Sequence, residues 1–121
     1  EPNMDKAALS YVIEKTQKLI NAPTCSKETK VAAKEWLEAI GTDGEAAQAK
    51  KYIAELEADI MPIDQLIGFA ESETGIQYFG ERAAKDIAAH AKEIKAAGAK
   101  YCDCPACTVV AEILEKKDAI L

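Results

Sequence analysis

The chain has 121 residues, of which 49% are hydrophobic and 30% charged, a composition that is ordinary for one globular domain. Its formal net charge of −6 argues against a nucleic-acid partner, because binding to phosphates requires a basic face. No apolar run approaches the roughly 18 residues that cross a bilayer, so no membrane segment and no membrane partner are expected. An unknown protein partner stays open.

Few glycines and prolines interrupt an alanine-rich sequence, and alanine is the best helix former. We expect a first helix over residues 4–21, which the turn Ala22-Pro23-Thr24-Cys25 ends. Ser26 can cap a second helix over residues 27–40, and Gly41 follows that helix at the position where glycine commonly ends one. Local sequence alone therefore predicts two consecutive helices with a short turn between them.

Thr42 and Glu45 match a capping box, which predicts a third helix over residues 43–59. Pro62 stops that helix and can occupy the first turn of a fourth. The end of the fourth helix stays open within residues 72–80.

Gly75 and Gly80 bracket the apolar and aromatic stretch Ile76-Gln77-Tyr78-Phe79. It could form a flexible flap over a pocket or a short helical turn that packs its aromatic rings into the core, and we favour the turn. A fifth helix is expected over residues 81–97 and a sixth over 105–117. The sequence thus predicts an all-α fold without a sheet: an antiparallel, up-and-down bundle of five to six helices in a single domain over residues 1–121.

Three of the four cysteines fall within six residues, in the run Cys102-Asp103-Cys104-Pro105-Ala106-Cys107. Pro105 is suited to the first helical position, which makes Cys104 the N-cap residue and places Cys107 in the first turn of the sixth helix. Backbone N–H groups without helical partners lie there, and this environment favours thiolates, which are both metal ligands and nucleophiles.

A fourth ligand would complete a tetrahedral zinc site, and the candidates are Cys25 and His90. In an up-and-down bundle, the turns after the first and fifth helices lie at the same end, which favours Cys25. His90 lies about 12 Å below that end, at a rise of about 1.5 Å per residue. It is adjacent to the apolar stripe of Ile87 and Ile94, so we expect a helix-face histidine with an ordinary hydrogen bond.

The chemistry of these thiols stays open between several uses. We favour a non-enzymatic helical module in which Cys25, Cys102, Cys104 and Cys107 bind zinc and join the turn between the first two helices to the turn before the sixth. The alternative is a small thiol–disulfide oxidoreductase in which Cys104 attacks and Cys107 or Cys102 resolves the mixed disulfide. An iron–sulfur cluster and unliganded cysteines are less favoured. Four cysteines without a visible export signal predict a reducing cytoplasm.

The cysteine cluster and several other short sequence runs of the chain together carry a resemblance to a known family. They are Trp36-Leu37, Ala39-Ile40-Gly41-Thr42, Met61-Pro62-Ile63-Asp64, Ala89-His90-Ala91-Lys92-Glu93, Ala97-Gly98-Ala99-Lys100 and the run from Tyr101 to Cys107. In these runs the chain resembles a family of small helical proteins of anaerobic Gram-positive bacteria with a C-terminal CDCPAC motif, sometimes labelled heat-shock chaperones. The resemblance implies no mechanism, and the chaperone label is not carried over because the chain has no glycine-rich phosphate loop.

Overall fold

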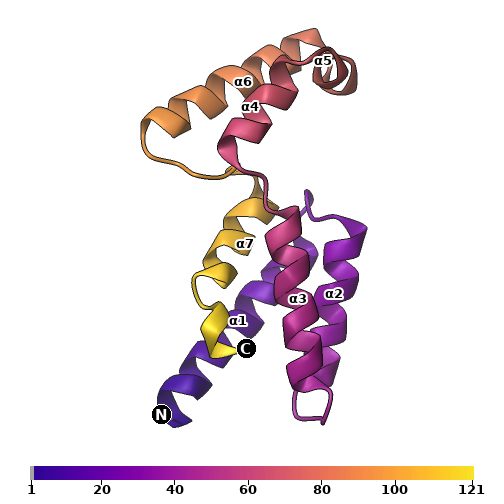
Figure 1. Cartoon of the computed structure of the whole chain (residues 1–121), viewed down its shortest axis with the longest axis vertical. Coiled ribbons are helices and arrows are strands. Elements are labelled where there is room, and N and C mark those ends of the chain that lie inside the picture. Colours follow the sequence, from indigo (N-terminus) through magenta and orange to yellow (C-terminus); the bar gives the residue numbers. More distant parts are fainter. Residues whose placement is uncertain (1) are drawn as a thin grey trace. The chain divides into compact units, whose positions relative to one another are not determined.

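The computed structural model describes the backbone of residues 2–121 and the side chains from Lys6 onward. Within that range the fold is all-helical, and the only strand-like feature is an isolated antiparallel bridge between Pro62 and Tyr101. The helices are α1 (Pro2–Asn21), α2 (Lys27–Ala39), α3 (Glu45–Asp59), α4 (Ile63–Glu71), α5 (Glu73–Phe79), α6 (Glu81–Ala96), α7 (Pro105–Leu114) and a final 3-10 turn (Lys117–Ala119) (Figure 1). The all-α class is confirmed. The described residues form seven α-helices where five or six were expected, and one bundle of that size is not confirmed.

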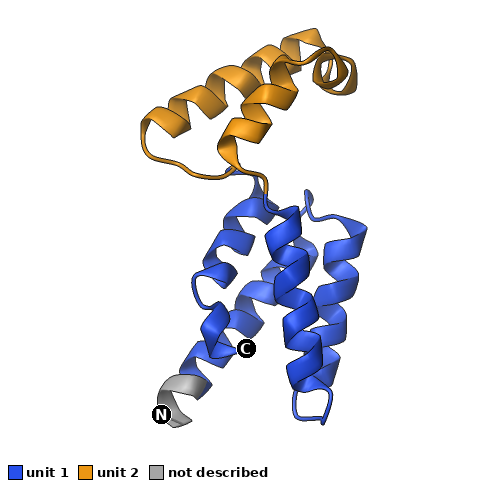
Figure 2. Ribbon diagram, viewed as in Figure 1, with its two compact units in different colours: residues 1–60, 103–121 blue, residues 61–102 orange. Residues whose placement is uncertain are grey.

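The helices group into two compact units (Figure 2). Unit 1 comprises residues 1–60 and 103–121, and unit 2 comprises residues 61–102. The sequence predicts a single domain, in which the two units would unfold together, and this stays a prediction.

Unit 1 contains α1, α2, α3 and α7 around one hydrophobic core. α2 packs on α3, and α1 packs on both α2 and α7. Trp36 of α2 is fully buried and stacks on Tyr52 of α3, with ring centroids 5.3 Å apart. The other buried side chains of this core include Val12, Leu19, Ala33, Ala49, Ile53, Leu56, Val110 and Ile113.

Two hydrogen bonds identify the helix ends that meet at one end of unit 1. The backbone N–H of Ala106, at the start of α7, donates to Oγ1 of Thr24, in the turn after α1, at 3.0 Å. The hydroxyl of Thr29, in the first turn of α2, donates to Oδ2 of Asp59, at the end of α3, at 2.6 Å. The turn that carries Cys25 therefore lies beside the start of α7. The bundle from which the sequence argument placed it there is not confirmed, because α5 is an additional helix and α4, α5 and α6 belong to a separate unit.

The capping box predicted at Thr42 is wrong. α3 begins at Glu45 and has no side-chain cap. Gly41, with φ of +84°, ends α2, and the Thr42 hydroxyl donates back to the carbonyl of Ala39 at 2.6 Å, while a Glu45 carboxylate oxygen accepts from the Gly41 N–H. Thr42 and Glu45 are thus used to close the preceding helix.

Unit 2 consists of α4, α5 and α6, and its two chain ends are fastened together. The N–H of Ile63 donates to the carbonyl of Lys100, and the N–H of Cys102 donates to the carbonyl of Met61, both at 2.8 Å. Gly98, with φ of +106°, follows α6, and the N–H of Ala99 bonds back to the carbonyl of Ile94, the closure expected of a glycine-ended helix. The first and last residues of unit 2 are therefore paired by backbone hydrogen bonds.

Ser72 divides the region that the sequence left open. It follows the last residue of α4 and caps α5, because its hydroxyl accepts from the N–H of Gly75 at 3.0 Å. The stretch between the two glycines is thus helical, as favoured. Its aromatic residues are less buried than expected: Phe79 is half-buried, whereas 76% of Tyr78 is exposed.

The buried hydroxyl pair of unit 1 gives a first prediction. Thr16 Oγ1 and the Tyr52 hydroxyl lie 2.7 Å apart in the core, and burial raises the pKa of Tyr52, which keeps it a neutral hydrogen-bonding group. Thr16→Val leaves the Tyr52 hydroxyl without its partner, and we expect a loss of about 1–3 kcal/mol in the free energy of unfolding, measured by urea denaturation. The double variant Thr16→Val/Tyr52→Phe should recover most of that loss. Additive losses would contradict the pairing.

Candidate metal centre

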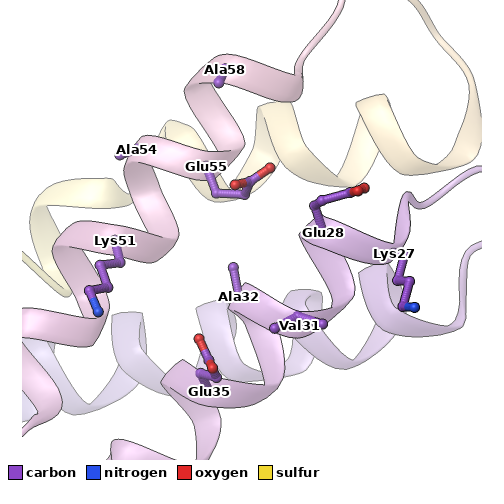
Figure 3. Close-up of a pocket in the computed structure, with 9 residues that line it drawn as sticks. All are labelled: Lys27, Glu28, Val31, Ala32, Glu35, Lys51, Ala54, Glu55 and Ala58. Carbon is purple, nitrogen blue, oxygen red and sulfur yellow. The ribbon is translucent and has the colours of Figure 1, made fainter.

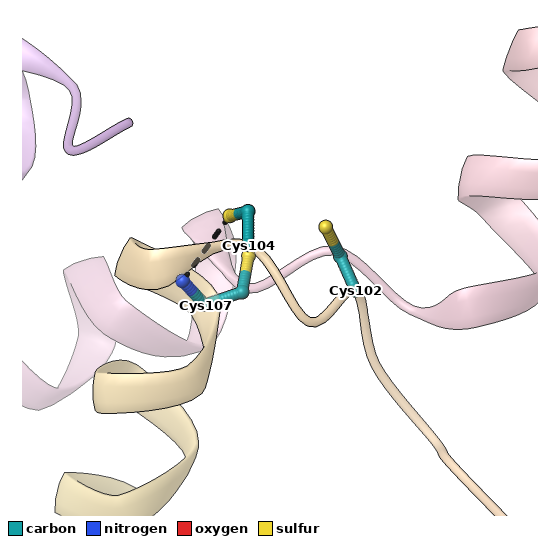
Figure 4. A group of neighbouring side chains, drawn as sticks. All are labelled: Cys102, Cys104 and Cys107. Carbon is teal, nitrogen blue, oxygen red and sulfur yellow. Dashed lines mark hydrogen bonds between the residues drawn. The ribbon is translucent and has the colours of Figure 1, made fainter. Parts of the chain in front are cut away.

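The cysteine segment is built around the start of α7. Pro105 occupies the first helical position, and Cys104 is the N-cap with extended backbone angles. The N–H of Cys107 donates to Sγ of Cys104 at 3.4 Å (Figure 4). This local arrangement was predicted from the sequence and is confirmed. A backbone donor directed at sulfur is the interaction that a thiolate or a metal-bound sulfur accepts.

The sulfur atoms of Cys102, Cys104 and Cys107 all lie within 4.8 Å of one another. All three residues are half-buried, so solvent can reach them. Zinc–sulfur bonds of about 2.3 Å in a tetrahedron separate sulfurs by about 3.8 Å, a spacing within the 4.8 Å limit of this triangle. The three cysteines are therefore close enough to hold a metal ion, and because they belong to six consecutive residues, the local chain path sets their spacing.

Cys25 lies near this segment but outside the three-sulfur set. Its thiol donates to its neighbour's carbonyl, that of Ser26, with a sulfur–oxygen distance of 3.6 Å. Cys25 and Cys107 line the same small cavity, of about 140 Å³. Burial raises the pKa of the Cys25 thiol, and the nearby charge of Asp59 adds to that effect. The role of Cys25 as the fourth ligand stays a prediction.

His90, the other candidate, is an exposed residue of α6. Among the residues whose side chains are described, it does not belong to the three-sulfur set either. It lies on α6, as expected, and its exposure places it outside the apolar face of that helix.

A polar network at the cavity is the feature that sequence reasoning missed. Asp59 lines the cavity together with Cys25 and Cys107, and it accepts the hydrogen bond of Thr29, whose hydroxyl also contacts that of Ser26 at 2.8 Å. Ser26 was recognised only as a helix cap. The pairing of Thr29 with Asp59 joins residues 30 positions apart, for which the sequence offers no signal.

Glu55 and Asp59 are four residues apart on α3, and this pair gives a prediction of pH dependence. A hydrogen bond with Asp59 raises the pKa of Glu55 from 4.5 to about 7. The folded protein therefore binds this proton more tightly than the unfolded chain, and the resulting stabilisation, complete below about pH 4.5, is lost as the pH rises through about 7. Glu55→Gln keeps an N–H donor, so its stability relative to wild type should increase between about pH 5 and pH 8 in urea unfolding. If the difference in free energy of unfolding between Glu55→Gln and the wild type were the same at both pH values, the raised pKa of Glu55 would be contradicted.

A larger groove, of about 730 Å³, runs between α2 and α3. Figure 3 shows Glu28 on α2 and Glu55 on α3 at this groove. The apolar part of its lining includes Val31, Ala32 and Ala54. None of its carboxylates belongs to a group of three or more ligands among the side chains that the structure describes. The cysteine segment is therefore the better candidate for a metal centre.

Within residues 2–121 no helix combines the length and apolarity needed to cross a bilayer. Comparisons of the chain with protein-family models, with curated proteins and with solved structures found no match. The family resemblance based on the CDCPAC motif therefore stays a prediction.

Proposed function

We propose that the protein is a zinc-binding helical module of the cytoplasm, in which Cys25, Cys102, Cys104 and Cys107 hold one ion. The observation that carries this proposal is the three-sulfur triangle, with every side at or below 4.8 Å. Thiolates are preferred ligands of structural zinc, and such sites are closed by four protein ligands. A closed site leaves no position for substrate, so the proposed role is structural and not enzymatic.

The contacts of the Cys25 turn support Cys25 as the fourth ligand. Thr24, its neighbour, accepts a hydrogen bond from the first turn of α7, and Cys25 and Cys107 face one cavity. Zinc in this position would attach the turn after α1 to the start of α7. It would add a metal bond to a contact that now consists of a hydrogen bond and apolar packing.

Metal content of the purified protein tests this assignment. We expect one zinc per chain in the wild type, a large loss in Cys25→Ser and no loss in His90→Ala, measured by elemental analysis after dialysis at fixed free zinc. His90→Ala is the matched control because it removes the other fourth-ligand candidate. A larger loss in His90→Ala than in Cys25→Ser would refute the ligand set.

One observation favours a second candidate, the thiol–disulfide oxidoreductase. The N–H of Cys107 donates to Sγ of Cys104 at the start of a helix, the arrangement that activates the attacking cysteine in C-x-x-C motifs. In that case Cys104 attacks a partner disulfide, and Cys107 or Cys102 displaces the reduced partner. This function would be favoured over zinc binding if the purified protein contained no metal and had one rapidly alkylated thiol. That rapid alkylation should be absent in Cys104→Ser.

A further inference from the structure

We propose that Cys102, Cys104 and Cys107 by themselves form a three-coordinate site for copper(I), and that Cys25 is required only for zinc. This inference rests on the proposed function in so far as the same three sulfurs serve both ions. The copper(I) site has three ligands, whereas the zinc site has four. Cys25→Ser should therefore weaken zinc binding without weakening copper(I) binding.

The geometry of the sulfur triangle is suited to a three-coordinate ion. Metal–sulfur bonds of about 2.3 Å to an ion in the plane of three sulfurs separate those sulfurs by about 4.0 Å. The sulfurs of Cys102, Cys104 and Cys107 lie within 4.8 Å of one another, whereas Cys25 is outside this set and its thiol points to the carbonyl of Ser26. The set is thus complete for trigonal coordination and one ligand short of a tetrahedron.

The donor atoms of the set also favour a soft ion. Among the described side chains, the set includes sulfur alone, without an imidazole nitrogen or a carboxylate oxygen, although Asp103 lies between two of the cysteines in sequence. Thiolates select copper(I) and zinc, whereas carboxylates suit harder ions such as magnesium and calcium. Zinc, in turn, takes four ligands in structural sites. The number of available thiolates therefore discriminates between the two ions.

The charges of the two complexes are equal. Three thiols that bind one copper(I) release three protons and leave a net charge of −2, and four thiols that bind one zinc release four protons and leave the same charge. The start of α7, with the N–H of Cys107 directed at Sγ of Cys104, stabilises negative charge on the cluster in both cases. No oxidation or reduction takes place, provided that copper is supplied in its monovalent state.

An anaerobic titration of the full-length protein with copper(I), in competition with the chromophoric chelator bicinchoninate, tests the proposal. We expect wild type and Cys25→Ser to bind one copper(I) with equal affinity. Cys102→Ser and Cys104→Ser should each bind more than about 100-fold more weakly, since loss of even an outer-shell group costs up to about that much. Two variants are used because Cys104 also caps α7, and circular dichroism checks that each is folded.

The outcomes separate the two proposals. If Cys25→Ser loses copper(I) as severely as Cys104→Ser does, Cys25 is a ligand for both ions, and the three-coordinate site is refuted while the zinc site stands. If Cys25→Ser keeps zinc as well as copper(I), the four-cysteine zinc site is refuted and the copper site stands. A wild type that cannot compete with the chelator, or that binds several copper ions per chain with equal affinity, overturns the copper proposal.

Discussion

Removal of zinc is expected to lower the thermal unfolding midpoint of the protein by roughly 10–20 °C. A ligand that binds only the folded state adds about 4 kcal/mol to the free energy of unfolding at a free concentration of 1,000 times its dissociation constant. For a chain of this length, that energy corresponds to a shift of this size. The physical reason is that the four proposed ligands come from two segments about 80 residues apart in sequence, which the unfolded chain cannot hold together.

Thermal melts followed by far-ultraviolet circular dichroism, at buffered free zinc and in excess chelator, measure this effect. Cys102→Ser serves as the control, because its melting temperature should not respond to zinc. A wild-type midpoint that is independent of free zinc would contradict a structural metal, even if the purified protein contained some zinc.

Gly75→Ala is expected to be the most damaging single-methyl change in unit 2. A Cβ atom at Gly75 would lie 1.7 Å from the carbonyl oxygen of Phe69 and 2.6 Å from its carbonyl carbon, and both belong to the backbone of α4. Since backbone atoms cannot rotate away, the start of α5 must shift. We expect a loss of about 3 kcal/mol in the free energy of unfolding, the upper end of the cost of overpacking.

Gly68→Ala is the matched control for that variant. Gly68 is an exposed residue in the interior of α4, and a Cβ atom there meets nothing within 4 Å. Alanine should therefore stabilise the helix by about 0.5–1 kcal/mol. Urea unfolding monitored by hydrogen exchange of α4 and α5 amides compares the two. Equal effects of both substitutions would show that α5 does not approach α4 as described.

Local chemistry explains which features could be predicted from the sequence. Ser26 caps α2, Gly98 ends α6, and Pro105 with Cys104 starts α7, because each of these depends on one residue and its near neighbours. The three-sulfur set belongs to the same class, since six consecutive residues contain all of it.

Competition between neighbouring signals explains one wrong prediction, at Thr42, and one that the sequence left open, at Ser72. Thr42 and Glu45 match a capping box, but the positive φ of Gly41 turns the chain so that both side chains bond back toward α2. From the sequence, Ser72 is compatible with a helix end or with a mid-helix position. In the structure it directly follows α4 and caps α5, and Gly75 then lies close to the backbone of Phe69. In both cases the backbone path decided between two uses of the same polar side chain.

The all-helical class, most helix boundaries and the cluster of three thiols at a helix start could be predicted without a structure, because they follow from interactions within a few residues. Three features required the folded chain: the division of the helices into two compact units, the hydrogen bond between Thr29 and Asp59 beside Cys25, and the cavity that Cys25 and Cys107 line together. These features depend on packing between segments that are 30 to about 80 residues apart, and helical periodicity indicates which face is buried without indicating which partner covers it.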